Sequence, residues 1–61
     1  MQETYGVDSN HFVIITLDAS GRKIYVPYYT NNRVSRYKQY TKNGKGVVCR
    51  SLEAALKVMG R

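Results

Sequence analysis

The sequence predicts an α+β fold: an antiparallel sheet of three or four strands, built from two hairpins, with one C-terminal amphipathic helix packed on one face. A β-branched apolar run early in the chain, turn sequences rich in Asp, Asn and Gly, and an apolar stripe at helical spacing near the C-terminus predict these elements. With 61 residues, the chain is expected to form one small domain over residues 1–61. A chain this short buries only about 60% of its unfolded surface, so we expect marginal stability and a stabilising partner.

The first predicted hairpin covers residues 11–30, and the unpatterned residues 1–9 before it are expected to form a loosely held tail. The run HFVIITL at 11–17 is short and largely apolar on both faces, which favours a central strand. A turn-forming DASGR and an alternating KIYVPYYT follow it. Because Pro27 has no N–H to donate, we expect the second strand to lie at an edge or to end there.

Residues 31–42 admit two interpretations. A capping asparagine at their start could begin a short helix. Alternatively, residues 35–41 form a strand that leads into Asn43-Gly44, a strong hairpin signal because both central positions of a type I′ turn need positive φ. We favour the second hairpin, with GVVCR at 46–50 as its returning strand.

The C-terminal helix is predicted from its ends and its stripe. Ser51 is a good N-cap, and Gly60 stands where a helix normally stops. The apolar positions follow the spacing i, i+3, i+4 and i+7, at Leu52, Ala55, Leu56 and Met59. A helix of two turns is not stable alone, so this stripe must pack on the sheet.

Catalytic chemistry is not expected. The four acids are scattered over different predicted elements, and His11 begins an apolar strand, where a structural histidine is the more frequent case. Cys49 is interpreted as a small core residue, and the glycines of NGKG lack the spacing of a phosphate loop. We therefore predict no enzyme activity, no metal, no cofactor and no small-molecule substrate.

The single cysteine fits a reducing compartment, and the N-terminus has no charged start followed by an apolar run. The longest apolar stretch, FVII, is far shorter than a membrane span. A cytoplasmic protein without membrane contact is expected.

The distribution of charge points to polyanions. The net charge is +6, and between Ala19 and Leu52 there are eight Lys or Arg and no acid. Such a field attracts polyanions, although basicity could also serve only to keep a small protein soluble. Lys and Arg neutralise phosphates, and tyrosines offer faces on which bases stack.

We expect an exposed, basic sheet face that projects away from the helix. Tyr28 and one of Tyr37 or Tyr40 are assigned to packing, since a chain without Trp needs aromatic bulk. The candidate nucleic-acid-binding residues are Arg22, Lys23, Tyr25, Tyr29, Arg33, Arg36, Tyr37, Lys38, Lys42, Lys45 and Arg50.

The segment GKGVVCRSLEAALKVMGR, a basic strand followed by a Ser-Leu-acid-Ala-Ala-Leu helix, resembles the end of small sheet-plus-helix DNA-binding domains. These include the arm-binding domains of tyrosine integrases and the plant AP2 domain, and the segment is also similar to short plasmid- and phage-borne proteins. The resemblance implies a sheet that lies in the major groove, a helix behind it, and DNA contacts from the exposed sheet residues.

The sequence thus favours a small accessory protein that binds DNA rather than RNA, acting as a homodimer or with a host protein. The alternative is a protein-binding module, such as a phage-type inhibitor or adaptor, that uses its tyrosines or an edge strand.

Overall fold

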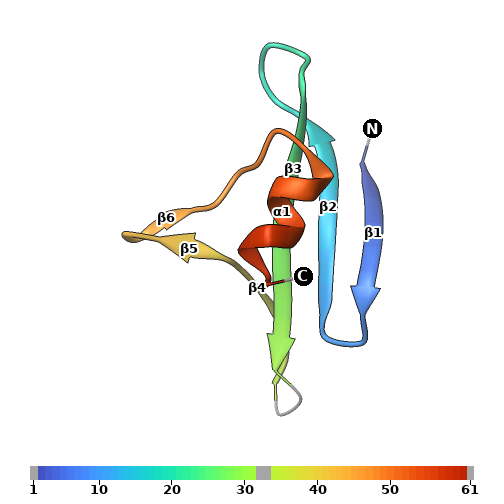
Figure 1. Ribbon diagram of the computed structural model, residues 1–61, viewed down its shortest axis with the longest axis vertical. Helices are drawn as coiled ribbons and strands as arrows, with labels where there is room; N and C mark the ends of the chain where they lie inside the picture. The colour runs from blue at the N-terminus through green and yellow to red at the C-terminus, as the bar shows by residue number, and fades with distance from the viewer. Residues whose placement is uncertain (1, 32–33, 61) are drawn as a thin grey trace.

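The computed structural model describes residues 2–31 and 34–60, apart from the side chains of residues 31 and 34–36. Its main sheet has four antiparallel strands in the order β1-β2-β3-β4. A second sheet, β5-β6, precedes the helix α1, which lies over β3 on one side of the main sheet (Figure 1). The predicted α+β fold is confirmed. The elements are β1 (Glu3–Asp8), β2 (His11–Leu17), β3 (Lys23–Asn31), β4 (Val34–Gln39), β5 (Thr41–Lys42), β6 (Lys45–Gly46) and α1 (Leu52–Val58).

The predicted first hairpin is formed by β2 and β3. Seven consecutive residue pairs hold these strands in one register. The turn between them places Gly21 at a φ of 85°, a left-handed conformation that glycine adopts without steric cost. As expected, β2 is an inner strand, because β1 lies on its other side.

The expectation of a loose tail over residues 1–9 is wrong for Glu3–Asp8, which pair with β2 as β1. An irregularity of the register between Gly6 and Asp8 accompanies this pairing, and Val7 packs against the core. Without β1, the edge of β2 would leave backbone groups unpaired. Backbone groups make the pairing between β1 and β2, so this pairing does not require an apolar pattern in the sequence. Residues 1–9 therefore show no hydrophobic period although most of them form a strand.

The expectation that Pro27 marks an edge or an end is also wrong, because β3 is an inner strand that continues to Asn31. Pro27 lies opposite Val13 of β2. Its carbonyl oxygen accepts the N–H of Tyr40 at 3.1 Å, on the side of β4. The missing N–H therefore also faces that side and removes no bond to β2.

The turn predicted at Asn43-Gly44 is confirmed, with φ values of 54° and 78°, but it joins only β5 and β6. A single returning strand over residues 46–50 was expected, and this is wrong. After β6 the chain returns to β3, where Cys49 and Tyr25 exchange two backbone hydrogen bonds of 2.9 Å. The reason is burial, since Cys49 belongs to the core under α1. The helix alternative is excluded for β4, which pairs with β3.

The predicted helix is confirmed as α1. Ser51 is its N-cap, and the Ser51 side chain accepts the N–H of Ala54 at 3.2 Å. Met59 is its C-cap, and Gly60 follows with a φ of 78°. It is the only helix among the residues that the structure describes, and no described helix is long and apolar enough to cross a membrane.

The core lies between α1 and the sheet. Val13 of β2, Cys49 and Ala55 of α1 form one buried cluster. Partly buried side chains pack around it, among them Ile15 and Tyr25. This core is small, which agrees with the limited burial that a chain of 61 residues can reach.

The strand registers divide the sheet into two faces, because residues directly opposite each other on neighbouring strands point to the same side. The side chains of Val13 and Tyr25 pack with α1, and we call their side the helix face. We call the other side the open face, because the one described helix does not cover it, and Val26 on this side is nevertheless buried. The described side chains of the open face are Thr4, Phe12, Ile14, Thr16, Ile24, Val26, Tyr28, Thr30, Tyr37 and Gln39.

Candidate nucleic-acid interface

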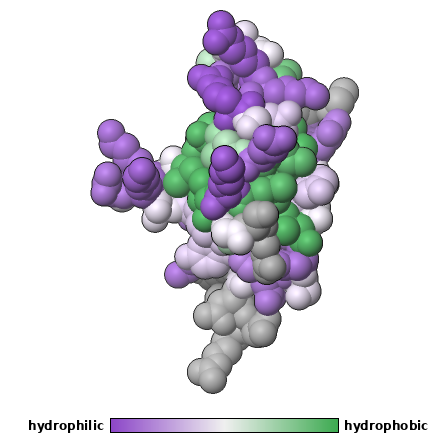
Figure 2. Space-filling model, viewed as in Figure 1, coloured by the Kyte–Doolittle hydropathy of each residue, from purple (hydrophilic) through white to green (hydrophobic). Residues whose placement is uncertain are grey.

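Residues 41–46 form a protruding two-stranded ribbon, which we call the arm. Figure 1 shows β5 and β6 extending sideways from the sheet, and Figure 2 shows that this projection is strongly hydrophilic. All six residues of the arm are exposed. The positive φ values of Asn43 and Gly44 close its tip, so the local sequence determines where the ribbon turns.

The arm is anchored where it leaves the sheet. The N–H of Val47 donates to the carbonyl oxygen of Tyr40 at 2.8 Å, which joins the two ends of the arm. Gln39 Nε2 donates to the carbonyl oxygen of Val47 at 3.2 Å. A Cβ atom at Gly46 would lie only 2.5 Å from Gln39 Nε2, so a side chain at this position would displace the end of Gln39 that donates to Val47. The arm thus projects from a fixed base.

Two lysines face each other across the arm. Lys42 and Lys45 are direct cross-strand partners. Within the described part of the chain, neither has an acidic partner. Like charges directly opposite each other destabilise a strand pair, and a bound anion would remove this repulsion. The arm therefore carries two exposed positive charges side by side.

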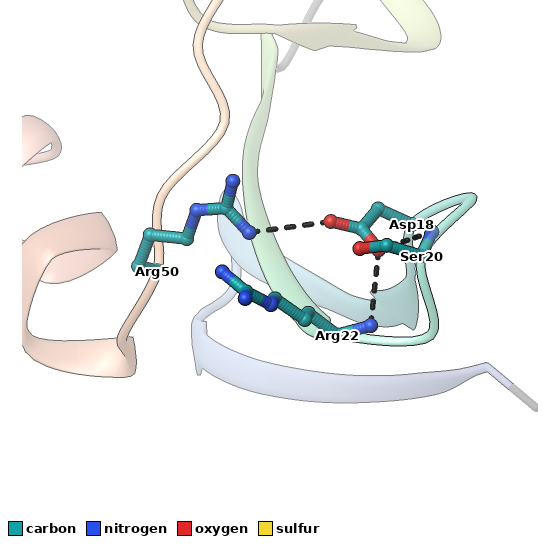
Figure 3. Close-up of polar contacts among 4 residues, drawn as sticks. All are labelled: Asp18, Ser20, Arg22 and Arg50. Carbon is teal, nitrogen blue, oxygen red and sulfur yellow. Dashed lines mark hydrogen bonds and ion pairs between the residues drawn. The ribbon is translucent and has the colours of Figure 1, made fainter.

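A second group of basic residues surrounds the turn between β2 and β3. Arg22 is the last residue of this turn, Lys23 begins β3, and Arg50 reaches the turn from the segment before α1 (Figure 3). Arg50 Nη1 lies 3.2 Å from Asp18 Oδ2, so one acid partly neutralises this group. Because Arg50 is largely exposed, the ion pair contributes little to stability.

Asp18 organises that turn. Its Oδ1 accepts the hydroxyl of Ser20 at 2.7 Å, the N–H of Ser20 at 2.9 Å and the N–H of Arg22 at 3.0 Å (Figure 3). The hydrogen bond from the Ser20 hydroxyl, and then that from the Arg22 N–H, lower the pKa of Asp18 to about 2. Asp18 is therefore a structural carboxylate that stays ionised over the physiological range.

Three of the described residues that were predicted for the exposed basic sheet face do not project away from the helix: Lys23, Tyr25 and Lys38. Tyr25 packs against the core on the helix face, so the prediction that its side chain projects away from the helix is wrong. The register also places Lys23 and Lys38 on the helix side, opposite Leu17 and Tyr29, where both lysines are exposed. Arg33 and the side chain of Arg36 lie outside the described residues.

The tyrosines divide between the two faces. Tyr29 and Tyr40 meet edge to face on the helix side, with ring centroids 4.8 Å apart. Tyr28 and Tyr37 lie on the open face. Tyr28 stacks on Phe12, which agrees with its assignment to packing. Tyr37 is 60% exposed, and its ring meets Phe12 edge to face at a centroid distance of 4.7 Å.

The remaining polar and nucleophilic groups have structural surroundings. His11 Nδ1 lies 2.8 Å from Asp8 Oδ1, at the turn between β1 and β2. Cys49 is buried, and burial raises the pKa of its thiol. No group of three His, Cys, Asp or Glu that could hold a metal ion occurs among the described residues. The predictions about catalysis and cofactors stay predictions.

Comparison with known proteins adds no assignment: no protein-family model, curated protein or solved structure matches the chain. The resemblance of residues 44–61 to small DNA-binding domains therefore remains a prediction. The sites described above stand on their own geometry.

Proposed function

We propose that the protein binds duplex DNA, and that the arm is its main contact. The observation that carries this proposal is the exposed two-stranded ribbon with Lys42 opposite Lys45. The major groove of B-DNA is wide enough to admit a two-stranded β-ribbon. A ribbon that projects from the body of the protein can enter the groove without a clash between the sheet and the phosphate backbones.

The polar composition of the arm suits this role. Its two lysines can neutralise phosphates, while Asn43 at the tip carries an amide that can donate to and accept from base edges. The basic group around the turn between β2 and β3, which consists of Arg22, Lys23 and Arg50, supplies further positive charge. Phosphate contacts provide affinity, and the tip is the part of the arm able to read sequence.

The test measures binding of a duplex oligonucleotide at several salt concentrations. Each phosphate contact contributes about 0.9 to the slope of log K against log salt, so K42Q/K45Q should lower the slope by about 2. K45Q should lower it by about 1, whereas K57Q, which removes one exposed lysine of α1, should leave it unchanged. Single-stranded DNA and structured RNA complete the series.

Three outcomes would contradict the proposal. The first is absence of duplex binding at about 50 mM salt. The second is an equal effect of K57Q and K45Q, which would mean that only net charge matters. The third is a preference for RNA. A protein that stays bound at high salt after nuclease treatment would instead favour the protein-binding alternative.

A further inference from the structure

Two arginines surround one carboxylate at the turn between β2 and β3. The backbone N–H of Arg22 donates to Asp18 Oδ1 at 3.0 Å, and Arg50 Nη1 lies 3.2 Å from Asp18 Oδ2. Figure 3 shows the Arg22 side chain extending from the turn towards the segment that carries Arg50, while the Arg50 side chain extends towards Asp18. Within the residues that the structure describes, the Arg22 guanidinium has no acidic partner. Two positive charges therefore stand around a single negative one.

The backbones of both arginines are held in place. The carbonyl oxygen of Arg22 accepts the N–H of Asp18 at 2.9 Å, which closes the turn. Arg50 stands between Cys49, whose backbone pairs with β3, and Ser51, the N-cap of α1. A ligand that binds both arginines has only their side chains to order, which limits the entropy lost on binding.

The two oxygens of the Asp18 carboxylate have separate roles. Oδ1 accepts all three hydrogen bonds of the turn, from the Ser20 hydroxyl and from the N–H groups of Ser20 and Arg22. Oδ2 faces Arg50, whose side chain is 68% exposed. An ion pair with one such exposed partner is weak, and the bonds of the turn do not depend on it. Arg50 can therefore leave Asp18 without opening the turn.

We propose that, when the protein binds DNA, a backbone phosphate takes the place of Asp18 at Arg50 and is held jointly by Arg50 and Arg22. This contact rests on the DNA binding proposed above and adds a second point of attachment to the arm. A guanidinium group can give a phosphate two parallel hydrogen bonds, and it replaces a single contact to Asp18.

Asp18 is then an internal competitor for Arg50. A free phosphate ion has to displace it from solution. A duplex that the arm already holds presents its phosphates at a high effective concentration, so it displaces Asp18 more readily. The turn thus favours the DNA backbone over single small anions.

Asp18→Asn tests the competition. The amide keeps an oxygen for the hydrogen bonds of the turn, but it carries no charge to hold Arg50. We expect the affinity for a duplex to rise about fivefold at about 50 mM salt. The matched control is Asp8→Asn, because Asp8 also accepts a backbone N–H two residues further along and lies before the opposite end of β2. It removes the same charge and should change the affinity less than about twofold.

The gain in affinity should depend on Arg50. Because this side chain is exposed, Arg50→Gln should keep the fold, which circular dichroism checks. It should lower the slope of log K against log salt by about 1. In the double variant D18N/R50Q, loss of the Asp18 charge should raise the affinity no more than Asp8→Asn does, because no guanidinium remains at position 50 to be released.

A titration with inorganic phosphate measures the site without DNA. The Nε–H NMR signals of Arg22 and Arg50 should shift together, and half of the change should require less phosphate in D18N than in the wild type. The wild type should require more than about 10 mM, because the free ion competes with Asp18. Saturation below about 1 mM would instead assign the site to a small phosphate-bearing molecule and overturn its assignment to the DNA backbone.

Other results would also overturn this contact. It is wrong if D18N and D8N strengthen duplex binding equally, if the gain from D18N persists in R50Q, or if phosphate moves the signal of neither arginine. Duplex binding that depends on the arm lysines but not on Arg50 contradicts this contact and leaves the arm contact standing. If no variant binds a duplex, the DNA proposal fails, and the phosphate titration still decides whether a phosphate replaces Asp18 at Arg50.

Discussion

Tyr40 donates its N–H to the carbonyl oxygen of Pro27 at 3.1 Å, but Pro27 has no N–H with which to return the bond. In an antiparallel pair of this type, each residue normally donates to the other. The carbonyl oxygen of Tyr40 instead accepts the N–H of Val47 at 2.8 Å. One proline in β3 thus frees the acceptor that closes the base of the arm.

Replacing Pro27 by alanine should weaken that closure. Alanine restores an N–H that competes with Val47 for the Tyr40 carbonyl, and it removes part of a fully buried ring. We expect a loss of about 1–3 kcal/mol in the free energy of unfolding, measured with urea. The amide of Val47 should also exchange its hydrogen faster. If the Val47 and Cys49 amides exchange in P27A as they do in the wild type, the competition does not occur.

The tip of the arm should depend on Gly44. Gly44→Ala places a side chain at a φ of 78°, which costs about 1–2 kcal/mol and should open the ribbon. We expect the cross-strand NMR contacts between Lys42 and Lys45 to weaken. Asn43→Gly is the control, since glycine tolerates the φ of 54° at that position and should keep these contacts. Equal losses in both variants would mean that the turn conformation does not hold the arm.

Much of the fold was predictable because its signals are local. The β-branched run at 11–17, the cap at Ser51 and the Asn43-Gly44 turn each act over a few residues, and all three predictions are confirmed. The pairing of β1 and the passage of β3 through Pro27 depend on partners distant in sequence, so the local pattern gave no indication of either.

The candidate site was predictable only in part. Lys42 and Lys45 were selected correctly as exposed residues. Tyr25 was placed on the wrong face because the alternation in β3 distinguishes two sides without indicating which one α1 covers. The more apolar side was the natural choice for the core, and α1 lies on the other.

The pH dependence of stability should show the contribution of Asp18. Its pKa is about 2 in the folded protein against 3.8 as the ordinary value, so the unfolded chain binds the proton more tightly. The stabilisation is then complete above pH 4 or so and is lost as pH falls towards about 2.

Asp18→Asn should flatten the acid limb of a plot of unfolding free energy against pH. Glu3→Gln, which removes another exposed carboxylate, serves as the comparison. The assignment fails if the difference in stability between wild type and D18N is the same at pH 5 and at pH 2.

The N-cap of α1 should contribute measurably to the free energy of unfolding, because the helix has only seven residues. Ser51→Ala removes the acceptor for the N–H of Ala54 and should cost about 1 kcal/mol in urea unfolding. Ser51→Asp keeps an acceptor and should lie within a few tenths of the wild type. If S51D loses as much unfolding free energy as S51A, the hydrogen bond to the N–H of Ala54 is not the reason why Ser51 stabilises the protein.

The backbone hydrogen bond from Val47 to Tyr40 closes the base of the arm, so the arm can be replaced without disturbing the main sheet. Since the chain is already closed at that point, residues 41–45 can be exchanged for a longer or shorter ribbon, with Gly46 kept beside Gln39, without removing a backbone bond of the main sheet. The body of the protein then serves as a scaffold, and ribbons of different length and sequence can be grafted onto it.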